Sequence, residues 1–253
     1  MTIRLHHRVS GLPGRPTVVV GGSLGSTLAS WEPQLAALSA DFRVIAYDHR
    51  GHGGSPAPAG PYSIEDLALD VLALLEEYQV ARAHVVGLSL GGMVAQVIAA
   101  QQPQRVDRLV LLATSAHSDG QSWTERAAIV RASGTEAIAD AAVGRWLTAS
   151  YRLAHPAVTA GLRDMLVSID DEGYAGCCEA IADMDLRPGL SRIRAPTLVL
   201  AGAEDPSMPP EQMRELANEI SDSRFVIVPG AHVPTIEHPD TVTRLLLEHL
   251  AAG

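Results

Sequence analysis

Cysteine is nearly absent from this chain, with only two among 253 residues. Cys177 and Cys178 are neighbours in the sequence, an arrangement that disfavours a structural disulfide and offers too few ligands for a zinc site. We therefore expect both to be small buried residues in a reducing compartment. This predicts a cytoplasmic protein without a bound metal.

Long apolar runs and basic clusters are missing as well. No run approaches the roughly 18 apolar residues that span a bilayer, and residues 1–8 lack the apolar stretch of a secretory signal. Asp and Glu number 29 against 19 Lys and Arg, which gives a net charge of −10. Because nucleic-acid binding depends largely on Lys and Arg, we expect no nucleic acid as partner. The missing apolar run leads us to expect no membrane as partner either.

Short apolar runs rich in β-branched residues alternate with segments of helical periodicity. The runs predict buried strands at 17–20, 42–47, 84–87, 108–113, 197–201 and 224–228. Such alternation predicts an α/β fold, with a mostly parallel central sheet flanked by helices on both faces. Residues 3–9 alternate more clearly and are expected to form an antiparallel edge strand.

Two helices stand out between these runs. Apolar residues recur at spacings of three and four over 64–78, and Ser63 with Asp66 supplies a capping box at the start. A second helix is expected over 90–101, where Pro103 stops it.

One long stretch, 115–188, shows helical patterns and no convincing strand. The simplest interpretation is a helical insertion that forms a cap over the carboxyl edge of the sheet, where open α/β sheets bind ligands. The expected division is therefore a core made of 1–114 and 189–253, with the cap at 115–188.

The strongest chemical signal is the pentapeptide GLSLG at 87–91, which matches G-x-S-x-G between a predicted strand and a predicted helix. In that context the serine occupies a sharp, strained turn. The residues two before and two after it must be small, or their side chains would collide within the turn. The pattern predicts that Ser89 is a nucleophile.

A serine hydroxyl is a weak nucleophile without an adjacent base, and this turn is typically followed in the chain by an acid and then a histidine. His232 follows the last predicted strand and is the expected base, with His238 as its nearest rival. The acid should follow the preceding strand, which leaves Asp205 or Glu204, and we favour Asp205. It would accept the Nδ1–H of the imidazole and fix its tautomer.

An oxyanion hole needs two backbone N–H groups. One is expected from Leu90, the residue after the nucleophile. The other is expected from the glycine-rich loop at 21–25, where we assign it to Ser23.

The same loop has a rival interpretation as a dinucleotide site, with Asp48 at the end of the next strand. The spacing contradicts it, because Gly21 and Gly22 are adjacent where G-x-G-x-x-G needs one residue between them. We therefore expect no cofactor.

At this point the sequence resembles a known family. The α/β-hydrolase pattern comprises DHRGHGGS at 48–55, the pentapeptide at 87–91, Asp205 and His232. Within that superfamily the chain is most similar to bacterial 3-oxoadipate enol-lactonases, through GSLGS at 22–26, RWLT at 145–148 and GYAGCCEAI at 173–181.

This resemblance implies the α/β-hydrolase fold and the hydrolysis of 3-oxoadipate enol-lactone to 3-oxoadipate, in the β-ketoadipate pathway of aromatic catabolism. The substrate would be a small anionic lactone, so a local cation or indole N–H should attract its carboxylate. Trp146, Arg131 and Arg145 are the candidates, with Trp123 and Arg126 behind them.

Two other functions remain open on the sequence alone. One is a general small-molecule carboxylesterase, or a perhydrolase of the cofactor-free haloperoxidase type, because the triad does not distinguish these from a lactonase. The other is a hydrolase-fold protein that only binds its ligand, which predicts a damaged triad where this sequence has an intact one.

Overall fold

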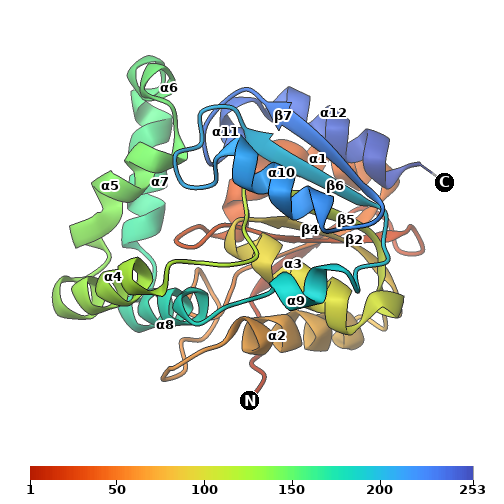
Figure 1. The fold of residues 1–253 in the computed structure, drawn as a ribbon, viewed down its shortest axis with the longest axis horizontal. Coiled ribbons are helices and arrows are strands. Elements are labelled where there is room, and N and C mark those ends of the chain that lie inside the picture. The colour runs from red at the N-terminus through yellow and green to blue at the C-terminus, as the bar shows by residue number, and fades with distance from the viewer. Residues whose placement is uncertain (253) are drawn as a thin grey trace.

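A single sheet of seven strands forms the centre of this computed structural model, which describes residues 1–252 (Figure 1). The strands lie in the order β1-β3-β2-β4-β5-β6-β7. β1 pairs with β3 antiparallel, and every other neighbouring pair is parallel. Their bounds are β1 His7–Ser10, β2 Thr17–Gly21, β3 Arg43–Tyr47, β4 Ala83–Leu88, β5 Val106–Leu112, β6 Thr197–Gly202 and β7 Ser223–Val228.

The predicted strands are confirmed to within about two residues at each end. The edge strand is antiparallel as expected, but it starts at His7 and not at Ile3. The reason is that two backbone N–H groups before His7 donate to side chains and not to the backbone of a neighbouring strand. The Ile3 N–H donates to Asp70 Oδ1 at 2.9 Å, and the His6 N–H donates to Ser55 Oγ at 2.8 Å.

Helices cover both faces of the sheet, with α1 and α12 on one side and α2, α3 and α9 on the other (Figure 1). The predicted capping box is present at the start of α2. No helix within residues 1–252 is both long enough and apolar enough to cross a membrane. The helices of the sheet layers are α1 Glu32–Asp41, α2 Ile64–Glu77, α3 Leu90–Gln101, α10 Pro210–Asn218, α11 Pro234–Glu237 and α12 Pro239–Leu250, with short 3₁₀ turns at Leu28–Trp31 and Pro103–Arg105.

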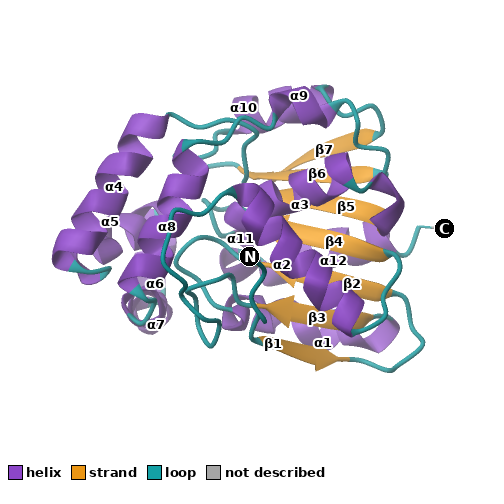
Figure 2. Ribbon diagram, turned by 90° about the horizontal axis from the view of Figure 1, so that it is seen from below, coloured by secondary structure: helices purple, strands orange, loops and turns teal. Residues whose placement is uncertain are grey.

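The stretch between β5 and β6 is helical, as predicted. Figure 2 shows α4 to α8 gathered beyond the end of the sheet toward which the parallel strands point. The backbone N–H of Leu186 donates to the Ala116 carbonyl at 2.7 Å, so the two chain segments that leave and rejoin the sheet layers lie side by side. The helices between β5 and β6 are α4 Gly120–Ser133, α5 Glu136–Trp146, α6 Ala149–Ala154, α7 Pro156–Val167, α8 Asp171–Ala182 and α9 Arg187–Leu190, the last of which lies against α3.

Candidate active site

Ser89 stands in the turn between β4 and α3 with φ 55° and ψ −112°. A non-glycine residue at positive φ is strained by about 1–3 kcal/mol, and such strain collects at functional sites. The two flanking glycines are needed for space. A Cβ on Gly87 would lie 2.2 Å from the Gly91 carbonyl oxygen, and one on Gly91 would lie 2.3 Å from that of Gly21. The turn therefore has the geometry that G-x-S-x-G predicts.

His232 and Asp205 lie together in the loops after β7 and β6. His232 Nδ1 is 2.8 Å from Asp205 Oδ2, and both side chains are buried. The other carboxylate oxygen, Oδ1, accepts the backbone N–H groups of Ser207 and Met208 at 2.8 and 3.1 Å. The carboxylate is thus fixed on one side and faces the imidazole on the other.

The rival residues lie elsewhere. Glu204 is exposed to solvent, and His238 occupies the N-cap position of α12. Neither of them lines the cavity that contains Ser89 and His232. The geometry therefore favours Asp205 and His232 as the partners of Ser89.

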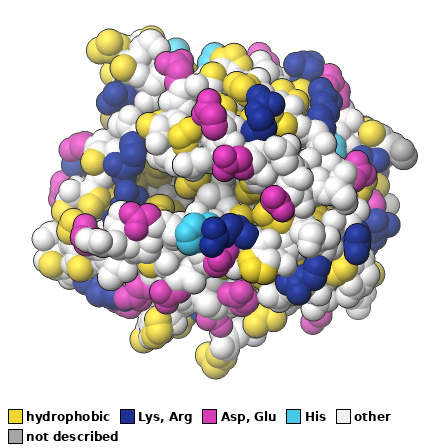
Figure 3. Space-filling model, viewed as in Figure 1, with side chains coloured by type: hydrophobic (Ala, Val, Ile, Leu, Met, Phe, Trp, Pro, Cys, Tyr) yellow, Lys and Arg dark blue, Asp and Glu magenta, His cyan; other side chains and the backbone are white. Residues whose placement is uncertain are grey.

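That cavity holds about 430 Å³ of empty space, counting its open mouth. It lies where the helical stretch meets the carboxyl end of the sheet, and Figure 3 shows the surface hollowed between these two parts. Its walls include residues of both parts: Ser23, Leu24, Ser89, Trp123, Arg126, Ala142, Arg145, Trp146, Tyr174, Ser207, Met208 and His232.

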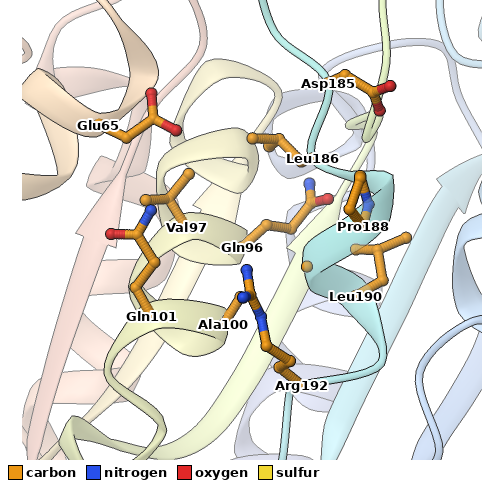
Figure 4. Close-up of a pocket in the computed structure, with 11 residues that line it drawn as sticks. Glu65, Gln96, Val97, Ala100, Gln101, Asp185, Leu186, Pro188, Leu190 and Arg192 are labelled. Carbon is orange, nitrogen blue, oxygen red and sulfur yellow. The ribbon is translucent and has the colours of Figure 1, made fainter.

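A second cavity, of about 410 Å³ on the same measure, lies between α2, α3 and α9 (Figure 4). Gln96 and Val97 of α3 line it together with Leu186 and Arg192. None of the predicted site residues borders it. We therefore take the cavity at Ser89 as the candidate active site.

Backbone amides for an oxyanion hole are available beside Ser89. In the described part of the chain, the N–H groups of Leu90 and Ser23 have no hydrogen-bond partner. The same holds for Leu24, which the sequence reasoning did not consider and which lines the cavity beside Ser23. Leu90 therefore stays the first expected donor, and the second comes from the pair Ser23 and Leu24.

Two guanidinium groups, those of Arg126 and Arg145, line the cavity. Neither forms an ion pair with any carboxylate of residues 1–252. Burial, together with the positive charge of Arg126, lowers the pKa of Arg145. Arg126 also lies over the Trp123 ring, 4.5 Å from its centre. Unpaired cations in an acidic protein make this cavity attractive to anions.

Arg131 does not belong to the site, which corrects the expectation that it binds the substrate. Its guanidinium contacts Glu172 at 2.8 Å and Glu179 at 2.5 Å, and it does not line the cavity. A cation already held by two carboxylates has little attraction left for a third. Of the tryptophan candidates, Trp146 and Trp123 both line the cavity.

Glu237 is a positioning residue that the sequence reasoning missed. Its carboxylate is buried and accepts the N–H and hydroxyl of Thr148 at 2.5 and 3.0 Å and the N–H of Ala231 at 2.7 Å. It thereby ties the residue before His232 to the chain that follows Trp146. No sequence pattern indicates this, since the partners are distant in the chain and the signal is a lone acid in a short helix.

The adjacent cysteines are both buried and unpaired, as expected. Burial raises the pKa of Cys178 to about 12 and raises that of Cys177 further. Because the thiolate is the reactive form, both thiols are inert packing residues of α8.

Burial also lowers the pKa of His49 to about 3, so this histidine stays neutral in the folded protein. In the unfolded chain it takes a proton below its ordinary pKa of about 6.5. The unfolded state then binds one proton more than the folded state, so the free energy of unfolding falls as the pH drops from about 6 toward 4. For one such group the expected slope is about 1.4 kcal/mol per pH unit.

We expect His49→Gln to remove this part of the acid sensitivity. The Gln amide N–H can still donate to the Gly22 carbonyl, which His49 Nε2 contacts at 3.0 Å. Urea denaturation at pH 6, 5 and 4 measures the slope for both proteins. Equal slopes would show that His49 is not the buried neutral group described here.

The fold and this site define the class. The chain belongs to the alpha/beta hydrolase fold family, whose model matches residues 10–239. The expected resemblance to bacterial 3-oxoadipate enol-lactonases is confirmed. The chain is 37% identical over 238 residues to 3-oxoadipate enol-lactonase 2 of Acinetobacter baylyi, covering 94% of this chain and 89% of that protein.

Solved structures agree with this placement. The enol-lactonase from Burkholderia xenovorans LB400 is 43% identical with a TM-score of 0.96, over 97% of this chain and 96% of that one. A thermophilic esterase from Thermogutta terrifontis, with malate bound, is 32% identical with a TM-score of 0.92, over 97% and 92% of the two chains.

Proposed function

We propose that this chain hydrolyses 3-oxoadipate enol-lactone to 3-oxoadipate, with Ser89 as nucleophile, His232 as general base and Asp205 as the acid that orients it. The observation that carries the proposal is a single cavity that contains both Ser89 and the unpaired guanidinium groups of Arg126 and Arg145. Ser89 supplies the chemistry of ester cleavage, and the two guanidinium groups suit a substrate with a free carboxylate.

In the first half of the reaction, His232 Nε2 takes the proton of the Ser89 hydroxyl as its oxygen attacks the lactone carbonyl. Negative charge develops on the carbonyl oxygen, where the Leu90 N–H and one amide of Ser23 or Leu24 would stabilise it. The ring C–O bond then breaks. The enol oxygen leaves with the proton from His232, and an acyl-enzyme remains.

In the second half, His232 takes a proton from water, and the resulting hydroxide attacks the acyl carbon. When the second tetrahedral intermediate collapses, the bond between the acyl carbon and the Ser89 oxygen breaks, and His232 gives its proton to that oxygen. The enol released by ring opening converts to the ketone, which gives 3-oxoadipate. Throughout, Asp205 holds the Nδ1–H of His232 and stabilises the imidazolium without taking the proton.

The substrate carboxylate would bind between Arg126 and Arg145. Charge-assisted hydrogen bonds of this kind are roughly twice as strong as neutral ones. The pKa of Arg145 is lowered by burial and, to a smaller extent, by the positive charge of Arg126, so a bound carboxylate would stabilise the charged guanidinium. The named relatives support this choice, since two are enol-lactonases and the related esterase holds malate, a dicarboxylate.

The helical stretch at 115–188 would act as a cap that gives the site its specificity, because Arg126 and Arg145 belong to α4 and α5. Residues 1–114 and 189–253 would form the catalytic core, of which residue 253 lies outside the described part of the chain. A role in the β-ketoadipate pathway and a location in the cytoplasm are parts of the same proposal.

The direct test is to add the purified protein to freshly generated enol-lactone and follow the loss of its ultraviolet absorbance, beside p-nitrophenyl acetate as a neutral ester. We expect a kcat/KM far higher for the lactone. A general carboxylesterase would instead favour the neutral ester. If the protein hydrolyses neither compound, it is not an ester or lactone hydrolase of this kind.

We further expect Arg126→Met and Arg145→Met each to raise KM for the enol-lactone by about 10- to 100-fold, the worth of one hydrogen bond to a charged group. KM for p-nitrophenyl acetate should stay unchanged, because that ester has no carboxylate. The matched control is Arg131→Met, which removes an arginine of α4, the helix of Arg126, that lies outside the cavity. Equal effects on both substrates would contradict a role in carboxylate binding.

A further inference from the structure

Two buried histidines hold the two ends of the loop at 22–25. His49 Nε2 lies 3.0 Å from the Gly22 carbonyl oxygen, and the Gly25 N–H donates to His52 Nε2 at 3.0 Å. Between these two contacts lie Ser23 and Leu24, whose N–H groups are the candidates for the second oxyanion donor. The position of those amides is therefore set from both sides by one turn, 48–55.

The partners fix which nitrogen of each ring carries the proton. A carbonyl oxygen can only accept, so His49 must carry its proton on Nε2. The Gly25 N–H can only donate, so His52 Nε2 must be unprotonated. The proton of His52 then lies on Nδ1, which is 3.0 Å from the Arg50 carbonyl oxygen. The two neighbouring histidines thus require opposite tautomers.

We propose that His52 is a positioning residue for the reaction, whose neutral Nδ1–H tautomer holds the loop at 22–25 where its amides can stabilise the oxyanion. This inference rests on the proposed function, since only acyl transfer requires the loop amides. A proton on Nε2 would set one N–H against another and release Gly25. His49 holds the other end of the loop through the Gly22 carbonyl oxygen. That contact needs only a proton on Nε2, which is present in the neutral Nε2–H ring and in the charged ring alike.

The surroundings of His52 keep the ring neutral and fixed. The ring is fully buried, and burial lowers its pKa. The ring stacks on Tyr174, with centres 6.5 Å apart, and meets the edge of His49 at 6.1 Å. Asp48 and Asp170 are the carboxylates that favour its charged form, but both already accept backbone N–H groups, from Leu28 and Gly54 and from Gly173.

The test compares two replacements of His52. His52→Gln keeps an acceptor for the Gly25 N–H, whereas His52→Leu fills the space without one. Hydrolysis of p-nitrophenyl acetate is measured per active site, counted by titration with a fluorophosphonate, so that misfolded protein does not enter the rate. The surface variant His155→Gln serves as the matched control.

We expect His52→Leu to lower kcat by about 10- to 100-fold, the effect of misplacing a catalytic group by about 1 Å, with KM unchanged. Affinity for phenylboronic acid, which binds serine as a tetrahedral adduct, should fall by the same factor. His52→Gln and His155→Gln should retain the activity of the unmodified protein. A residue needed only for folding would reduce the number of active sites and leave kcat per site and boronate affinity unchanged.

Nitrogen NMR of the ¹⁵N-histidine-labelled protein tests the inference without activity. We expect His52 as the Nδ1–H tautomer and His49 as the Nε2–H tautomer. An Nε2–H tautomer at His52 would overturn the inference, as would full kcat in His52→Leu or an equal loss in His52→Gln. A protein that cleaves neither ester nor lactone would refute the proposed function separately, and the tautomers would still decide the role of His52 in the loop.

Discussion

Replacing Ser89 by alanine is expected to lower kcat for the enol-lactone and for p-nitrophenyl acetate alike, by about 10⁴- to 10⁶-fold. The hydroxyl is the only group in the proposed mechanism that bonds to the acyl carbon, and the strained turn presents no other nucleophile in its place. The cavity and its two guanidinium groups remain. Binding of adipate, a competing dicarboxylate, should therefore persist while turnover is lost.

The measurement needs a serine that is chemically similar but remote. Ser122→Ala provides it, because Ser122 is exposed on α4 and its hydroxyl donates to the Asp119 carbonyl. This control should keep full activity and react with a fluorophosphonate, whereas Ser89→Ala should not. Labelling of Ser89→Ala at another serine, with activity retained, would refute the assignment of the nucleophile.

Asp205→Asn is expected to lower kcat by about 10⁴-fold at neutral pH. The reason is in the surroundings of the carboxylate. The N–H groups of Ser207 and Met208 bond to Oδ1, so an Asn at this position would keep its carbonyl oxygen there. Its amide N–H would then face His232 Nδ1, force the proton onto Nε2, and leave no lone pair to accept the proton of the Ser89 hydroxyl.

The control for this variant is Glu204→Gln, one residue earlier in the chain and exposed. It removes the same negative charge from the same loop without touching His232, so its kcat should be unchanged. Steady-state kinetics at pH 7 with both substrates separates the two cases. Similar losses in both variants would point to general electrostatics of the loop, and not to a specific tautomer.

Much of the fold could be predicted because parallel strands buried on both faces are nearly continuous apolar runs. The runs at 84–87 and 197–201 correspond to β4 and β6, whose burial is complete along their length. Ser89, Asp205 and His232 could be placed for a related reason. Each follows a strand that the apolar pattern locates, and the carboxyl ends of parallel strands meet at one edge of the sheet.

The lining of the cavity could not be predicted in the same way. Arg126 and Arg131 both belong to α4, but five residues rotate a helix by about 140°, so their side chains point to different sides. α4 has polar residues around most of its surface, and the sequence therefore does not indicate which side faces inward. The carboxylates that pair with Arg131 lie 41 and 48 residues away in the chain, which no local pattern reveals.

The buried carboxylate of Glu237 has a consequence for the loop that carries His232. Parting the chain at Thr148 from the loop at Ala231 would break all three hydrogen bonds of this one side chain. The backbone just before His232 is therefore coupled to the chain that follows Trp146, so a displacement of one is transmitted to the other.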